Sequence, residues 1–500
     1  MYETAPDETR AWRLAFALVG ALTVLRLAVL FTTPLELYPD EAQYWLWSRT
    51  LDFGYFSKPP MIAWLIAATT SLGNAEPFVR LAAPFLHAGA ALALYGVGQR
   101  LYGAKTGLAA CAVYSLMPGV QLSSGVISTD APLLFFLSLA LLAYVTLQAR
   151  RSLGPAIALG VALGLAMLSK YAAAYAVVAI VLHLIVSKEA RRAWSLPAAL
   201  AAIAAFALVL APNIVWNARH DFATIEHTAS NAHWATQLGG LPELGDFLGS
   251  QFGVFGPVPF AVLIGGAVVL ALRRRLARED VLLLCFALPP LLVVAAQAFI
   301  SRSNANWAAS AYVAGSVLAA AWLIRWRAKW WLVGGLGLQA VVAALFLTWA
   351  AFPKTADAMG VSNSFKRAKG WSQSVEAIVD RARAEPGLTA VAVDDRFLFN
   401  TAAYYGRDYF GREGPPLRMW VSSAHAQNQA EAEAPLTPAL GAYVLAASLE
   451  GVYRDRMAAD FARAQTVEIS RVRLDPKRVR RVEMLIGEGF SPLARAPKQP

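Results

Sequence analysis

The sequence predicts a polytopic α-helical membrane protein with a C-terminal soluble α/β domain. Three observations predict this class. The 500-residue chain is 57% hydrophobic, which is too apolar for a soluble multidomain protein. Apolar segments of roughly 20 residues, the length that crosses the hydrocarbon core, recur until Phe352. From Pro353 onward, charged residues become frequent and the apolar runs shorten to the length of strands and soluble helices.

The apolar segments predict about eleven membrane spans. The first is long enough to stay in the membrane as a helix, so we do not expect a cleaved signal peptide. Residues 1–352 are expected to form the membrane domain, with a first outer loop at 34–78, and residues 353–500 the soluble domain. The spans are expected at residues 12–33, 79–99, 105–122, 131–148, 153–169, 171–187, 195–215, 252–272, 280–300, 307–324 and 330–351.

The basic residues predict the orientation of the chain in the membrane. They concentrate in every second segment between spans, which the positive-inside rule assigns to the cytoplasm together with the N-terminus. An odd number of spans then puts residues 353–500 outside. The basic segments also account for the net charge of +11 without a nucleic-acid partner. They carry Arg10 and Arg13; Arg100 and Lys105; Arg150 and Arg151; Lys188, Arg191 and Arg192; Arg273, Arg274, Arg275 and Arg278; and Arg325, Arg327 and Lys329.

This orientation depends on a break at Ser169-Lys170-Tyr171, where two short spans meet with almost no loop. A single bent helix there would place every later arginine cluster outside. The charge pattern therefore favours two spans.

The first outer loop is the richest in polar and aromatic residues. Residues 41–51 are expected to form an amphipathic helix on the membrane surface, with Trp45, Trp47 and Leu51 at the interface, before another apolar helix at about 61–73. Asp40 follows Pro39, so it is either the N-cap of that helix or a catalytic carboxylate, and the two roles are compatible.

Asp130 repeats this pattern in the second outer loop, where Ser128-Thr129-Asp130-Ala131-Pro132 enters a span. It too is either an N-cap, with Pro132 in the first turn, or a functional group. Asp and Glu are nearly absent from the spans, so two such carboxylates on one face favour function. A carboxylate can activate a hydroxyl group as a general base.

Cations are predicted to collect on the same side: Lys58, Lys170, Arg302 and, in the outer half of the first span, Arg26. Placing a lysine between two apolar helices costs free energy unless its ammonium group meets an anion or its alkyl chain extends to the membrane interface. Phosphate is the anion that best accounts for the whole set, because it accepts charge-assisted hydrogen bonds. Arg26 has a second interpretation, an ion pair with Asp40 or Asp130.

The third outer loop contains Glu226 and His227, and such side chains can ligate a divalent metal. Their spacing matches no metal motif, so solvated loop residues are the competing interpretation. Ser301–Trp307 offers further amide and guanidinium donors. The chain has no Walker-type glycine loop, no G-x-S-x-G and no H-E-x-x-H.

Four motifs together resemble the GT-C glycosyltransferases: Pro39–Ala42, Gly54–Pro60, Ser128–Pro132 and Gly164–Tyr171. The chain is most similar to the bacterial branch that uses phospholipid carriers, which is related to protein O-mannosyltransferases and lipid A aminoarabinose transferases. The resemblance extends to about residue 352. It also implies that residues 353–500 form a periplasmic domain that caps the site.

The resemblance implies roles for individual residues. Asp40 matches the catalytic carboxylate, Asp130 the second acidic residue, and Lys58 and Lys170 lysines that contact the donor phosphate. The neighbouring motif residues are expected to contact substrate; they are Glu41, Tyr55 and Tyr171. Glu226 and His227 are similar to a Glu-His pair of the aminoarabinose enzymes, whose histidine helps to hold a metal. Those enzymes have an acidic residue before the lysine, where this chain has Ser57, which weakens the case for a divalent metal.

The expected function is transfer of a sugar from a polyprenyl-phosphate donor at the periplasmic face of a bacterial inner membrane. Asp40 would act as base in an inverting displacement, and Lys58, Lys170 and Arg302 would neutralise the leaving phosphate. Lipid A or another envelope glycan, or protein hydroxyls, all fit as acceptor. A flippase for lipid-linked sugars is the alternative, but the cytoplasmic halves of the helices offer few polar residues. A non-catalytic sensor would not need Asp40 and Asp130.

The soluble domain is expected to be α/β. A helix near Ser374–Ala384 precedes a strand at Leu388–Val393. Further strands are expected at Leu417–Val421, Ala442–Leu445 and Thr466–Leu474. Asp394 and Asp395 lie at a strand end, where the two carboxylates are expected either to contact a ligand or to be solvated.

Overall fold

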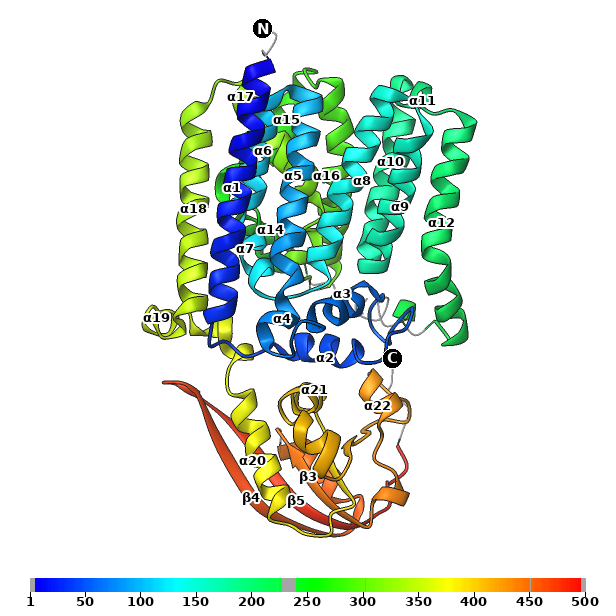
Figure 1. Ribbon diagram of the computed structural model, residues 1–500, viewed down its shortest axis with the longest axis vertical. Coiled ribbons are helices and arrows are strands. Elements are labelled where there is room, and N and C mark those ends of the chain that lie inside the picture. The colour runs from blue at the N-terminus through cyan, green and yellow to red at the C-terminus, as the bar shows by residue number, and fades with distance from the viewer. Residues whose placement is uncertain (1–4, 223, 227–239, 302, 450, 496–500) are drawn as a thin grey trace.

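The computed structural model describes residues 5–222, 224–226, 240–301, 303–449 and 451–495. A bundle of helices occupies the first 351 residues, and a sheet with its helices lies beyond one end of the bundle (Figure 1). Short helices of the first loop lie between the two parts (Figure 1).

The bundle consists of long and short helices separated by tight turns. Two 3-10 turns, η1 (Tyr171–Ala173) and η2 (Ala305–Ala308), interrupt it. The helices are α1 (Ala5–Thr32), α5 (Ala82–Tyr102), α6 (Ala104–Leu116), α7 (Pro118–Gly125), α8 (Asp130–Arg150), α9 (Leu153–Ser169), α10 (Ala174–Val186), α11 (Lys188–Ala193), α12 (Leu196–Arg219), α14 (Leu241–Val254), α15 (Pro257–Leu272), α16 (Arg278–Ile300), α17 (Ala311–Arg325) and α18 (Lys329–Ala351).

Six helices of the described chain are long and apolar enough to cross a membrane, which makes this a multi-pass membrane protein. They are Glu8–Thr32, Glu76–Tyr102, Asp130–Arg150, Leu196–Arg219, Arg278–Ile300 and Lys329–Ala351. Five shorter apolar helices accompany them, so the count of about eleven spans stays a prediction. The single helix expected over 105–122 is wrong, because α6 ends at Leu116 and α7 begins at Pro118, whose ring nitrogen has no hydrogen to donate.

The break at Lys170 is confirmed. Lys170 is extended (φ −164°, ψ 134°), and its backbone ends α9 before η1 and α10 begin. The helix α9 packs against α8 and α12, whereas α10 packs against α16. The turn between α9 and α10, to which Lys170 belongs, lies at the end of the bundle that faces the C-terminal sheet (Figure 1).

The first loop folds into three short helices, α2 (Pro39–Trp47), α3 (Met61–Thr70) and α4 (Glu76–Arg80). Trp45 and Trp47 are buried, and the expectation that they lie at the membrane interface is wrong. The Trp47 ring stacks on Tyr55 with centroids 4.8 Å apart, and Trp45 meets Tyr404 of the C-terminal part edge-on at 4.9 Å. The C-terminal part covers the face of α2 that was expected to meet lipid.

The C-terminal part contains a five-stranded sheet in the order β2-β1-β3-β5-β4. The strand β1 is parallel to its neighbours β2 and β3, and β5 is antiparallel to β3 and β4. All four predicted strands are confirmed, whereas β5 was missed. The strands are β1 (Ala390–Val393), β2 (Leu417–Met419), β3 (Tyr443–Ser448), β4 (Phe461–Asp475) and β5 (Arg478–Phe490).

Helices cover this sheet on the side of the bundle and at its edges (Figure 1). The predicted helix near Ser374–Ala384 is confirmed as α20 (Trp371–Arg383). Asp395 is the N-cap of α21, since its carboxylate accepts hydrogen bonds from the backbone of Phe397 and Leu398. The other elements are α19 (Pro353–Ala358), η3 (Ser362–Ala368), α21 (Arg396–Tyr405), η4 (Tyr409–Glu413), α22 (Gln429–Glu433), η5 (Pro438–Leu440) and α23 (Gly451–Ala458).

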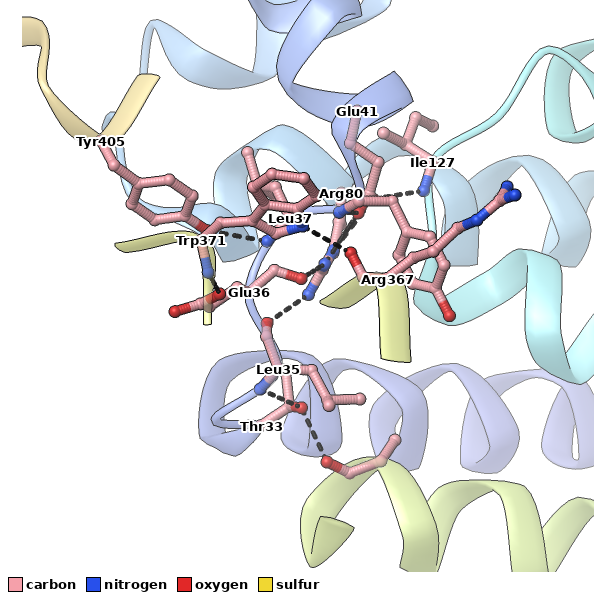
Figure 2. Close-up of polar contacts among 12 residues, drawn as sticks. Thr33, Leu35, Glu36, Leu37, Glu41, Arg80, Ile127, Arg367, Trp371 and Tyr405 are labelled. Carbon is pink, nitrogen blue, oxygen red and sulfur yellow. Dashed lines mark hydrogen bonds and ion pairs between the residues drawn. The ribbon is translucent and has the colours of Figure 1, made fainter. Parts of the chain in front are cut away.

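Polar contacts dock the C-terminal part on the first loop. The carboxylate of Glu36 accepts a hydrogen bond from the backbone N–H group of Trp371 at 2.5 Å (Figure 2). It accepts a second hydrogen bond from the backbone N–H group of Ser372 at 3.2 Å. The Leu37 N–H donates to the Tyr405 hydroxyl at 2.8 Å. The loop that contains Asp40 is thereby tied to α20 and α21.

Candidate active site

The ion pair between Asp130 and Lys170 joins two turns at the end of the bundle. Lys170 Nζ lies 2.7 Å from Asp130 Oδ1, and Asn306 Nδ2 donates to Asp130 Oδ2 at 2.7 Å. The Asp130 side chain is 12% exposed and that of Lys170 is 22% exposed. A partly buried pair of this kind retains its charges because each group compensates the other and Asn306 satisfies the second oxygen.

The Asp130 carboxylate is therefore engaged by side chains, and Thr129 is the N-cap of α8. The N-cap interpretation of Asp130 is wrong. It is also wrong for Asp40, because Tyr38 is the N-cap of α2 and Asp40 lies in the first helical turn. Asp40 is half-buried, and its carboxylate has no hydrogen-bond partner among the residues that the structure describes. It differs in this from Asp130, whose two oxygens are bound by Lys170 and Asn306.

Electrostatic interactions connect Lys58 to both carboxylates. Burial lowers the pKa of the Lys58 ammonium and the charge of Lys170 lowers it further, while the charges of Asp40 and Asp130 oppose this shift. Burial also raises the pKa of Tyr44 on α2, and the Asp40 and Asp130 charges raise it further. The structure thus brings together four residues that the sequence predicts to share a site: Asp40, Lys58, Asp130 and Lys170.

A cavity of about 420 Å³ opens beside the two lysines. Its polar rim is formed by Ser57, Lys58 and Lys170, and its walls include Tyr175, Val294 and Trp307. Two cations at one end and apolar walls along the rest suit a ligand that has an anionic head and an apolar body.

Glu41 lies apart from this cavity, although it follows Asp40. Its side chain is 1% exposed and forms an ion pair with Arg80 at 2.7 Å. It also accepts hydrogen bonds from the backbone N–H groups of Tyr38 and Ile127, both at 2.9 Å (Figure 2). The expected substrate contact of Glu41 is not supported, because every approach to its carboxylate is occupied by protein.

Three other predicted residues have protein partners. The Tyr55 hydroxyl donates to the backbone of Trp47 and Thr50, so it braces the loop. Arg26 donates to the Ser115 carbonyl at 2.6 Å and to Gln121 at 3.1 Å, and the expected pairing with Asp40 or Asp130 is wrong. Tyr171 lines the cavity, but its hydroxyl is bound by two asparagines of α12, Asn213 and Asn217.

The predicted metal residues are not joined into a site by the described chain. Glu226 is exposed, while His227 and the predicted phosphate ligand Arg302 lie outside the described residues. Within the described ranges, no three His, Cys, Asp or Glu side chains come together in a group that would hold a metal. The described residues alone therefore do not make up a metal site.

Arg396 is a residue of this region that sequence reasoning missed. It begins α21, and its charge acts on both Lys58 and Tyr44. The only signal in the sequence was its position directly after Asp394-Asp395 at a strand end. Nothing in the sequence connected this strand end to the first loop.

Comparison with known proteins agrees with this architecture. The model of the dolichyl-phosphate-mannose-protein mannosyltransferase family matches residues 57–216. The lipid A galacturonosyltransferase RgtD of Rhizobium johnstonii is 39% identical over 343 residues, which are 68% of this chain and 72% of that protein.

Two solved structures share the fold over nearly the whole chain. ArnT from Cupriavidus metallidurans in the apo state superposes with a TM-score of 0.66 at 17% identity, covering 95% of this chain and 98% of that one. The same enzyme bound to undecaprenyl phosphate gives a TM-score of 0.62 at 19% identity, covering 94% and 98%. With its 39% identity to the Rhizobium enzyme, the chain belongs to the GT-C superfamily of membrane glycosyltransferases.

Proposed function

We propose that the chain is an enzyme of the bacterial inner membrane that transfers a sugar from a polyprenyl-phosphate donor to lipid A. The observation that carries the proposal is the cavity with Lys58 and Lys170 at its polar rim and apolar side chains along its walls. A prenyl phosphate has the matching chemistry, because its head needs cations and its chain needs apolar contacts. The undecaprenyl phosphate bound by Cupriavidus ArnT and the lipid A named for the Rhizobium relative support the same two substrates.

The proposal assigns the site and residues 353–500 to the periplasmic side. The helices α8, α15 and α17 end at the far end of the bundle from the sheet (Figure 1). Their C-terminal ends carry Arg150 and Arg151, Arg273 to Arg275, and Arg325 and Arg327. The positive-inside rule assigns that end to the cytoplasm.

The proposed reaction is a single displacement at the anomeric carbon. Asp40 takes the proton of the acceptor hydroxyl while the new carbon–oxygen bond forms, and the bond to the phosphate oxygen breaks on the opposite side. The configuration is inverted and polyprenyl phosphate leaves. Lys58 neutralises the charge that develops on this leaving group, and Asp130 holds Lys170 in position to do the same.

Galacturonic acid is the first donor sugar to test. The Rhizobium relative is named for galacturonosyl transfer, and the cationic rim of Lys58 and Lys170 suits a donor that carries a second negative charge. The departure at Ser57 agrees with this choice, because a serine does not repel an acidic sugar as a carboxylate would.

The test is transfer of radiolabelled sugar to lipid A by detergent-purified protein. Asp40→Asn is expected to lower kcat by about 10²–10⁴-fold, the usual contribution of a general base, without loss of folded protein. Asp246→Asn is the matched control, since Asp246 is an exposed carboxylate of the predicted loop 216–251. Near-normal turnover of Asp40→Asn would refute the assignment of the base. A flippase moves a lipid-linked sugar from one side of a membrane to the other, and protein in detergent has no such second compartment. Sugar transfer by the detergent-purified wild-type protein would therefore also exclude a flippase.

A further inference from the structure

A second cavity, of about 490 Å³, lies where the first loop meets the C-terminal part. One wall is α2, through Gln43, Trp45 and Trp47, and the others come from α21, β2 and α22. Figure 1 shows α21 and α22 facing α2 across this junction. The volume is within the range of about 300–1,000 Å³ that is typical of ligand sites.

Four arginines line this cavity: Arg49, Arg396, Arg407 and Arg418. None of them forms an ion pair with another described residue. Arg49 donates to the hydroxyls of Ser48 and Thr70, Arg407 to the carbonyl of Tyr404 at 2.6 Å, and Arg418 to the carbonyl of Leu417 at 3.0 Å. Arg396 lies over the ring of Phe397.

A single carboxylate, that of Glu433, is found among the described residues of the lining, and it accepts a hydrogen bond from Gln429. Positive charge therefore exceeds negative charge in a partly enclosed space. Like charges that line one cavity repel one another, and an anion that binds in the cavity offsets this repulsion. Most of the guanidinium donors of Arg407 and Arg418 have no acceptor among the described residues, whereas Arg49 uses its donors on Ser48 and Thr70.

The rest of the lining suits a carbohydrate. The lining includes the apolar side chains of Leu46 and Phe410, and the amides of Gln43, Asn400 and Asn428 carry donors and acceptors that suit hydroxyl groups. Guanidinium forks match phosphate and carboxylate oxygens in a bidentate manner. The lining as a whole fits a sugar that carries an oxyanion.

The cavity also lies next to the carboxylate assigned as base. Gln43 is three residues after Asp40, one turn along the same helix, so both side chains project from neighbouring positions of α2. Arg396 belongs to the lining, and its charge reaches Lys58 at the rim of the donor cavity. Asp40 is thus related to both cavities, through Gln43 on its own helix to this one and through its charge interaction with Lys58 to the donor cavity.

We propose that this second cavity binds the anionic sugar headgroup of the acceptor glycolipid, with Arg407 and Arg418 as ligands of its phosphate or carboxylate. The proposal rests on the proposed function, since it needs an acceptor. It adds a binding site in which the C-terminal part selects the acceptor.

The experiment compares acceptor and donor kinetics in the double variant Arg407→Gln/Arg418→Gln. The probes are phosphorylated lipid A and the same lipid after chemical removal of its phosphates. We expect KM for phosphorylated lipid A to rise by about tenfold or more, as for loss of two charge-assisted contacts, with the donor KM unchanged. Arg471→Gln, at an exposed arginine of β4, is the matched control and should leave both constants unchanged.

Slow hydrolysis of the donor by water separates the two proposals. It requires the catalytic residues but no acceptor, so the double variant should keep the wild-type rate of hydrolysis, which also shows that it is folded. The single variants Arg407→Lys and Arg418→Lys, which keep the charge but lose the fork, should give smaller increases in acceptor KM.

The outcomes are distinct. If wild-type protein transfers sugar and the double variant keeps its acceptor KM, the cavity proposal is wrong and the proposed function stands. If the donor KM rises instead, the arginines bind the donor sugar and the proposal is also wrong. A KM increase confined to phosphorylated lipid A identifies phosphate as the anion, whereas an equal increase with the dephosphorylated lipid shows that the arginines do not bind an anion of the acceptor and overturns the cavity proposal. If wild-type protein transfers no sugar from any donor, the proposed function itself fails.

Discussion

Arg80 holds the carboxylate of Glu41, the residue after Asp40, at 2.7 Å in a contact that is almost fully removed from solvent. The same guanidinium donates to the carbonyls of Leu35 and Glu36, at 3.0 and 2.7 Å (Figure 2). One ion pair thus fixes the chain on both sides of the start of α2. Asp40 is oriented by this arrangement and not by contacts of its own side chain.

Arg80→Ala should strongly destabilise the protein, because it leaves the Glu41 carboxylate buried without its counter-ion. Loss of one partner from a buried pair typically costs about 3–5 kcal/mol. The thermal unfolding midpoint in detergent measures the effect. Arg463→Ala, at an 86% exposed arginine paired with Glu488, is the control and should change stability by less than about 1 kcal/mol. Equal shifts in both variants would contradict the structural role of the pair.

The lowered pKa of Lys58 predicts a pH dependence of donor binding. Burial and the charge of Lys170 cause Lys58 to lose its proton at a lower pH than an ordinary lysine. Donor KM should therefore rise as the pH increases through this lowered pKa, since the phosphate loses a cation. Lys58→Arg stays charged over this range and should move the rise to higher pH. The control is Lys354→Arg, at an exposed lysine, which should leave the pH dependence of donor KM unchanged. If Lys58→Arg also left this pH dependence unchanged, Lys58 would be excluded as the titrating group.

Asp130 and Lys170 should act as one unit in donor capture. Since Asp130 holds Lys170 at 2.7 Å, removing either one disrupts the same phosphate contact. We expect Asp130→Asn and Lys170→Met each to raise donor KM by about tenfold, and the double variant to be little worse than either single variant. A double-mutant cycle on kcat/KM for the donor measures this coupling. Additive losses would show that Asp130 has a separate role, such as a contact with the acceptor.

The sequence was sufficient to predict the pair of Asp130 and Lys170 as part of one site. Both are charged residues at the ends of apolar helices, where few polar partners exist, so membrane physics restricts where they can lie. The break after Ser169 followed from the charge pattern of distant loops. In the C-terminal part, the strands β1 to β4 could be recognised from their own local sequence patterns.

Other features depend on contacts that no local pattern reveals. The burial of Trp45 and Trp47 is a consequence of the docking of α21, and their amphipathic spacing is equally typical of a helix at the membrane interface. Glu41 was assigned to the substrate because it neighbours Asp40 in the motif, and nothing in the sequence connects it to Arg80, which lies within the predicted span 79–99. Arg396 is brought to the first loop by the tertiary fold alone. The strand β5 was missed because its first residues are rich in arginine and four consecutive residues, 482–485, are buried in place of an alternating pattern.

The carboxyl group of Asp394 predicts that the stability of the C-terminal part depends on pH. Burial raises its pKa from 3.8 to about 7, against the opposing effect of the hydrogen bond from Ser448, while the charge of Asp395 raises it further. The folded state therefore keeps a proton that the unfolded state releases between these two values. The stabilisation from Asp394 is complete below about pH 4 and is lost as the pH rises through about 7, at about 1.4 kcal/mol for each unit of pKa difference.

Asp394→Asn should remove this dependence, because the amide stays neutral at every pH. The variant should be more stable than the wild type at pH 8 and similar to it at pH 4. Hydrogen exchange in β1 and β3, corrected for the intrinsic effect of pH on exchange, reports the local stability around Asp394. Asp380→Asn, at a 66% exposed carboxylate of α20, is the matched control and should retain the wild-type slope. If Asp394→Asn also retained that slope, a different group would have to carry the pH dependence of this sheet.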